Sequence, residues 1–137
     1  MSTIIPYIGF NGKCREAMTF YQSCLGGELI LNQVGGSPME AHVPGPPEQI
    51  FHSELSDGKF MLLGTDFSGQ AGHIVGNNIS VTIVCSSEED IRKFFGKLSE
   101  GAEITMPLEK TFWADLFGSL KDKYGISWML NYDSNQK

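Results

Sequence analysis

The sequence partly repeats itself at a constant offset, and this repeat restricts the possible folds more than any other feature. Matching residues recur 74 positions apart (94 − 20 = 74) in three pairs: Phe20 and Phe94, Gly27 and Gly101, and Ile30 and Ile104. Around these pairs, the apolar face of one predicted helix recurs in a second. A repeat of this length predicts two similar modules, each with an apolar face that must be buried.

Each module has the same predicted order of strand, helix and three strands. The first module has predicted strands at 4–10, 28–34, 50–55 and 60–65 and a helix at 14–25. The second has strands at 78–85, 102–108, 112–120 and 126–132 and a helix starting at 86. We therefore expect one α+β domain over 1–137, with modules at 1–68 and 76–133 and helices on one side of a curved mixed sheet.

The composition excludes several classes of partner. The net charge of −6 argues against nucleic acid and anionic membranes, because both require a basic surface. The longest apolar runs are about eight residues, too short for a membrane span. Three cysteines at unmatched spacings favour reduced thiols in a cytoplasmic protein over a disulfide framework. Four of the six prolines lie in 35–48, a long loop of the kind that forms a flap or contacts a partner.

Several motifs carry a resemblance to a known family. They are Pro6 to Cys14, Gly26 to Glu28, His52 to Leu55, Thr111 to Trp113 and Asp122 to Asn131. With its two βαβββ modules, the chain resembles the glyoxalase/bleomycin resistance/dioxygenase (vicinal oxygen chelate) superfamily. Within that superfamily it looks like the PhnB-like, or 3-demethylubiquinone methyltransferase-like, branch. The methyltransferase label has no physical support in the sequence, because no glycine-rich turn opens a doubly wound sheet.

The resemblance implies where a metal would bind. Metal enzymes of the superfamily place one ligand on the first and last strands of each module. In this chain those positions fall at Pro6, Leu62, Ser80 and Met129. A divalent metal needs converging oxygen or imidazole donors, and this set offers one hydroxyl. We therefore predict no cofactor and no metal centre of the usual type.

The same four positions define the face on which we expect a ligand, because residues two apart in a strand share a face. That face would line a cavity between the modules and bind a small apolar or aromatic metabolite. The predicted ligand-binding residues are Ile8, Phe10, Leu62, Ser80, Thr82, Trp113, Leu116, Met129 and Asn131. Leu116 is included because a four-residue turn at 122–125 would pair it with Asn131.

His52 and Glu54 are the strongest polar candidates, since their spacing places both on one face of a strand. Glu54 could orient His52 as a general base. Alternatively, both could bind a divalent metal with Asp66 in a lyase or oxygenase, or the pair could simply face solvent or a subunit. Cys14, Cys24 and Cys85 fit buried packing positions better than catalytic ones.

Phe112 and Trp113 are adjacent aromatic residues that could close over a ligand or fill a subunit contact. The resemblance implies a homodimer. The leading hypothesis is a small-molecule binding protein without a visible catalytic centre. The alternatives are the metal-dependent lyase or oxygenase and a dimeric interaction module.

Overall fold

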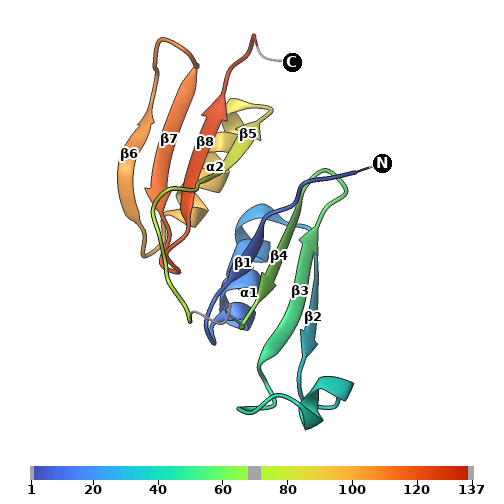
Figure 1. The fold of residues 1–137 in the computed structure, drawn as a ribbon. Coiled ribbons are helices and arrows are strands. Elements are labelled where there is room, and N and C mark those ends of the chain that lie inside the picture. The colour runs from blue at the N-terminus through green and yellow to red at the C-terminus, as the bar shows by residue number, and fades with distance from the viewer. Residues whose placement is uncertain (1, 68–71, 136–137) are drawn as a thin grey trace. The chain divides into compact units, whose positions relative to one another are not determined.

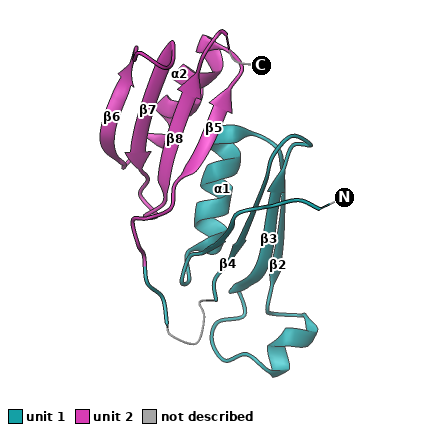
Figure 2. Ribbon diagram, turned by 45° about the horizontal axis from the view of Figure 1, so that its top comes forward, with its two compact units in different colours: residues 1–74 teal, residues 75–137 magenta. Residues whose placement is uncertain are grey.

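The structure is a computed structural model that describes residues 2–67 and 72–135. The chain divides into two compact units, 1–74 and 75–137 (Figure 2). Each unit has the predicted order of strand, helix and three strands, and the α+β prediction with two modules is confirmed.

Unit 1 forms a four-stranded mixed sheet in the order β1-β4-β3-β2, with one helix across it (Figure 1). Its elements are β1 (Tyr7–Gly9), α1 (Cys14–Leu25), β2 (Glu28–Gln33), the short 3-10 helix η1 (Pro38–Ala41), β3 (Ile50–Ser56) and β4 (Met61–Thr65). The first strand runs parallel to the last, and the other neighbours are antiparallel.

Unit 2 repeats this topology in the order β5-β8-β7-β6, again with the first strand parallel to the last. Its elements are β5 (Val81–Cys85), α2 (Glu88–Leu98), β6 (Glu103–Glu109), β7 (Leu116–Lys121) and β8 (Ser127–Tyr132). The two helices begin 74 residues apart (88 − 14), which matches the sequence repeat, whereas β3 and β7 begin only 66 apart (116 − 50). The loop after β2 accounts for the difference.

In each unit the helix covers one face of its own sheet. Ala17, Met18 and Tyr21 of α1 are fully buried, as is Leu55 on the facing strand. The helix lies so close to the sheet that a Cβ on Gly64 would be 3.0 Å from the Met18 sulfur. Burial of such apolar side chains is the main stabilising contribution to each unit.

Unit 2 packs in the same way. Ile91, Phe95 and Leu98 of α2 are buried, together with Trp128 and Leu130 of β8. Trp128 and Leu130 thus belong to the core of unit 2. No helix in the described part of the chain is both long and apolar enough to cross a bilayer.

Candidate functional site

The open face of the sheet in unit 1, which α1 does not cover, carries the polar pair singled out in the sequence. Ser53 and Leu55 are fully buried toward the helix, so the alternating His52 and Glu54 share the opposite face, as predicted. Glu54 is paired with Leu63 of β4, which in turn is paired with Tyr7 of β1. The Tyr7 and His52 ring centroids are 5.9 Å apart.

Asp66 does not join His52 and Glu54. Its Oδ1 accepts a hydrogen bond from the backbone N–H of Cys14 at 2.7 Å, and its Oδ2 accepts one from that of Ile50 at 2.8 Å. Among the described residues, no three His, Cys, Asp or Glu side chains are grouped as a metal site would require. The proposed ligand set of His52, Glu54 and Asp66 is therefore wrong, because the Asp66 carboxylate holds two backbone segments together instead.

Three predicted ligand-binding residues of unit 1 lie on the other side of the sheet. Leu62 is 4% exposed and paired with Leu55, and Phe10 is 6% exposed with its ring centroid 6.0 Å from that of Tyr21. Ile8 is paired with Gly64, which faces Met18 of α1. The prediction that Ile8, Phe10 and Leu62 lie on the open face is therefore wrong. The alternation along these strands is displaced by one residue, so Tyr7 and Leu63 lie on the open face instead.

The open face of unit 2 carries three of the six residues predicted for this unit. Thr82 is paired with Met129 and Val84 with Asn131, and these side chains alternate with the buried Trp128 and Leu130. The assignment of Thr82, Met129 and Asn131 to this face is confirmed. Ser80 is exposed and precedes β5.

Leu116 does not lie on this open face. It is paired with Tyr132, whereas Asn131 is paired with Phe117 and Met129 with Ser119. The connection from β7 to β8 has five residues between the paired Lys121 and Ser127 rather than four. This difference moves every residue of β7 to the other face of the sheet. The prediction that Leu116 lies on the open face is therefore wrong. The glycine at 125 is the sequence signal that could have indicated a bulged turn, and its φ in the structure is +90°.

Phe112 and Trp113 are held in a fixed turn next to this face. The Thr111 hydroxyl oxygen accepts hydrogen bonds from the backbone N–H groups of Trp113 and Ala114 at 3.3 and 3.1 Å. The Trp113 ring meets the Phe117 ring edge-on, with centroids 5.4 Å apart, and remains 45% exposed. An aromatic surface therefore stands beside Asn131, the ladder partner of Phe117.

The metal positions implied by the fold can now be read from the structure. On the open faces, the first and last strands carry Tyr7 and Leu63 in unit 1 and Thr82 and Met129 in unit 2. These side chains offer two hydroxyl groups, a thioether and no carboxylate or imidazole. The donor set does not fit a hard divalent ion.

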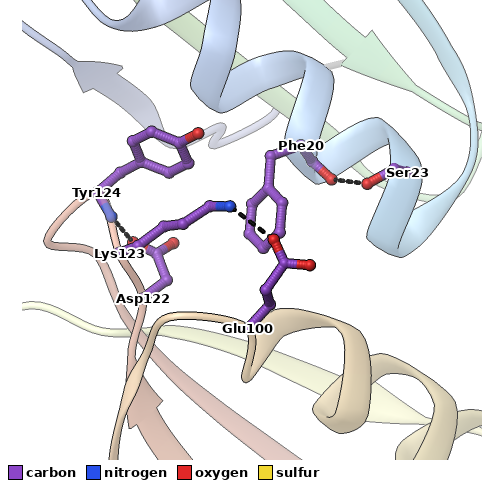
Figure 3. Close-up of polar contacts among 6 residues, drawn as sticks. All are labelled: Phe20, Ser23, Glu100, Asp122, Lys123 and Tyr124. Atoms are coloured by element: carbon purple, nitrogen blue, oxygen red, sulfur yellow. Dashed lines mark hydrogen bonds and ion pairs between the residues drawn. The ribbon is translucent and has the colours of Figure 1, made fainter.

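The Asp122 to Asn131 motif forms a buried structural turn. Asp122 Oδ1 accepts hydrogen bonds from the backbone N–H groups of Tyr124 (2.8 Å) and Ile126 (3.0 Å), and its Oδ2 accepts one from the Trp128 indole at 2.8 Å. Lys123 Nζ lies 2.9 Å from a carboxylate oxygen of Glu100 (Figure 3). The Asp122 to Asn131 motif therefore has a structural role: it holds the turn between β7 and β8 in place.

The cysteines are poor nucleophiles. Desolvation by burial raises the pKa of the Cys14 thiol from 9.0 to about 11, and it does the same for Cys85. The Cys14 sulfur lies 3.3 Å from the hydroxyl oxygen of Ser53. Because the thiolate is the reactive form, both thiols are expected to be inert at neutral pH.

This gives a prediction for labelling and for pH dependence. Native protein at neutral pH should resist alkylation by iodoacetamide, and mass spectrometry should detect modification of Cys14 and Cys85 only after unfolding in urea. The folded pKa of about 11 exceeds the unfolded value of 9.0, so the unfolded state loses these protons first as the pH rises. The free energy of unfolding should therefore fall above about pH 9. Rapid labelling of native protein would contradict the buried placement.

A small cavity adjoins the open face of unit 1. It has a volume of about 290 Å³ and is lined by Tyr7, Gly9, Thr65, Phe67, Gly72, His73 and Ile74. Its volume is at the lower limit for a small-molecule site. Tyr7 connects it to His52 through their ring contact.

Comparison with known proteins gives a consistent picture. Residues 2–131 match the family described as 3-demethylubiquinone-9 3-methyltransferase. Protein PA1353 from Pseudomonas aeruginosa has 32% identity and a TM-score of 0.82, over 97% of this chain and 98% of that one. A PhnB protein from Bacillus cereus has 28% identity and a TM-score of 0.79, over 96% and 99%. YjdN of Escherichia coli is 28% identical over 143 residues, 96% of this chain and 95% of YjdN.

More distant structures share the fold. A glyoxalase/bleomycin resistance protein/dioxygenase family enzyme from Burkholderia phytofirmans has a TM-score of 0.62 at 14% identity, over 94% of each chain. At this identity the likeness concerns the fold alone.

Proposed function

Since the chain belongs to the 3-demethylubiquinone-9 3-methyltransferase family, PhnB-like proteins with the glyoxalase/bleomycin resistance fold, we propose that it binds a small apolar or aromatic molecule on the open faces of its sheets. The observation that carries this proposal is the aromatic surface of unit 2. There the half-exposed Trp113 ring packs edge-on against Phe117, and Phe117 is paired with Asn131 on the neighbouring strand.

The chemistry of that face supports this class of ligand. Val84 is 60% exposed and Met129 is 38% exposed, although both are apolar. Exposed apolar side chains with a few hydroxyl and amide groups among them are typical of ligand-binding surfaces. Thr82 and Asn131 supply the polar groups. A planar aromatic molecule with one hydrogen-bonding substituent would match this arrangement.

We further propose that binding needs neither a metal of the usual type nor a nucleoside methyl donor. The open-face side chains of the four end strands are poor ligands for a divalent ion, as described above. A nucleoside cofactor is ordinarily held at the glycine-rich first turn of a doubly wound parallel sheet. Among the described residues, each unit has a four-stranded mixed sheet with one α-helix, and this arrangement offers no such turn.

Tryptophan fluorescence tests the proposal directly. Small aromatic alcohols and amides, such as benzyl alcohol and benzamide, should shift the emission of Trp113 and raise the melting temperature. Trp128 is buried, so its emission should stay constant. Removing the Trp113 ring should weaken binding roughly tenfold, because one aromatic contact contributes up to about 1.5 kcal/mol.

The matched control is Phe94→Ala, which removes an aromatic ring from α2 of the same unit. This variant should keep the affinity of the wild-type protein. Equal loss of binding in Trp113→Ala and Phe94→Ala would show that the aromatic surface next to Asn131 is not the site. No binding of any member of a broad aromatic panel would overturn the proposal as a whole.

The homodimer stays a prediction. It is supported by Phe112, which is 96% exposed, next to Trp113. Exposed neighbouring aromatic residues are common anchors of subunit contacts.

A further inference from the structure

Unit 1 has a second and larger cavity, located away from its open sheet face. It has a volume of about 630 Å³ and lies between the exposed side of α1 and the segment 46–49 that leads into β3. Its lining residues are Gly12, Arg15, Glu16, Thr19, Pro46, Glu48, Gln49 and Asp66. This volume is within the range of sites that bind small molecules.

Hydrogen bonds hold the walls of this cavity in place. Arg15 Nη2 donates to Gln33 Oε1 at 2.9 Å and to the backbone carbonyl of Glu48 at 3.3 Å, so α1 is tied to the loop. The loop is closed at its base by the bond from the backbone N–H of Val34 to the carbonyl of Gln49 at 2.8 Å. These bonds hold the backbone of Glu48 and Gln49 next to α1 and the end of β2.

One polar atom in the wall has an unmet hydrogen-bonding requirement. Gln49 Oε1 is buried and has no hydrogen-bond partner among the described residues. Gly45, with a φ of +117°, covers the amide so closely that a Cβ there would be 2.8 Å from Gln49 Nε2. Buried acceptors in native proteins are nearly always paired, so this one calls for a donor that the described residues do not supply.

The charge of the cavity indicates what kind of donor fits. Three carboxylates line it, against the single guanidinium of Arg15. Asp66 already accepts two backbone hydrogen bonds, so Glu16 and Glu48 are the carboxylates that would balance the charge of a ligand. That guanidinium already donates to Gln33 and to the Glu48 carbonyl. A ligand with a positive charge and N–H donors is therefore favoured over an anion.

We propose that this cavity is a binding site for a small organic cation, a primary amine, with Gln49 Oε1 as an acceptor. Because Gly45 covers the amide, the segment 44–47 must shift when the amine reaches Oε1. The site shares no lining residue with the aromatic surface of unit 2, so the two proposals stand independently.

Calorimetry with ethanolamine and 1,4-diaminobutane tests the site, with glycolate and succinate as anionic counterparts. The amines should bind saturably and the carboxylates should not. Gln49→Met keeps an unbranched side chain but removes the acceptor. It should raise the melting temperature of the free protein and weaken amine binding roughly tenfold or more, because a hydrogen bond to a charged donor is lost. A purely structural role for Gln49 would not produce both effects.

Two further variants complete the test. Glu48→Gln should weaken amine binding, whereas Glu28→Gln, which removes an equal charge from an exposed position on β2, should leave it unchanged. The Glu48 variant also keeps the test valid if Gln49→Met does not fold. Absence of amine binding to the wild-type protein, binding of the carboxylates instead, or unchanged affinity in both Gln49→Met and Glu48→Gln would each overturn the proposal.

Discussion

Replacing Asp122 with alanine is expected to lower the free energy of unfolding by roughly 4 kcal/mol. The carboxylate is 4% exposed and accepts three hydrogen bonds, two from the backbone of the turn and one from the Trp128 indole. Without it, the buried indole N–H loses this carboxylate acceptor, and losing the acceptor of a buried donor costs about 1–3 kcal/mol. Urea unfolding followed by tryptophan fluorescence measures the change.

The chain contains a matched control for this experiment. Asp57 Oδ1 accepts hydrogen bonds from the backbone N–H groups of Lys59 and Phe60 in the corresponding turn of unit 1, but the site is exposed. Asp57→Ala should cost only about 1 kcal/mol, because water replaces the lost acceptor. Asp122→Asn, which retains one carbonyl oxygen, should lie between the two. Equal losses in Asp57→Ala and Asp122→Ala would mean that the indole contact contributes nothing.

The second large effect is expected at Asp66. Its carboxylate joins the first residue of α1 to the first residue of β3 through the backbone N–H groups of Cys14 and Ile50. Asp66→Asn replaces one acceptor oxygen with an NH₂ group that points at a backbone donor. The free energy of unfolding should fall by about 3 kcal/mol, since one buried N–H loses its partner and a carboxylate leaves the helix N-terminus.

Hydrogen exchange should show where this loss acts. The amides of the first turn of α1 and the start of β3 should exchange faster in Asp66→Asn, while those of α2 should not change. Ser87→Ala is the control, because Ser87 caps α2 through the backbone N–H of Asp90 at 3.0 Å. Losing this local cap should cost only about 1 kcal/mol. An Asp66 variant no less stable than Ser87→Ala would refute the bridging role.

The sequence predicts the local elements well because each depends on neighbouring residues. The repeat located both helices. The caps show where local reasoning fails. The N-cap residue of α1, Lys13, makes no side-chain hydrogen bond. The carboxylate of Asp66, 52 residues from Cys14, satisfies that helix end instead.

The residues of the open faces were harder to predict. An error of one residue in the alternation along a strand places every side chain of that strand on the opposite face of the sheet. In β4, Leu62 and Leu63 are both apolar, so hydrophobicity does not decide which one faces the helix. In β7, Leu116 and Phe117 present the same ambiguity. The polar spacing of His52 and Glu54 on β3 was informative because these residues alternate with Ser53 and Leu55, which are fully buried.

The topology of the sheets has a consequence for the order in which the chain can assemble. In each unit the first strand pairs with the last, so Tyr7 meets Leu63 across 56 residues (63 − 7) and Val81 meets Trp128 across 47 (128 − 81). During synthesis, β1 therefore emerges from the ribosome long before β4, the strand with which it pairs, exists. Contacts this distant along the chain make folding slow, since the loop must close before the pairing is gained. Residues 1–74 can complete their sheet while unit 2 is still being translated, so a growing chain exposes at most one unfinished sheet at a time.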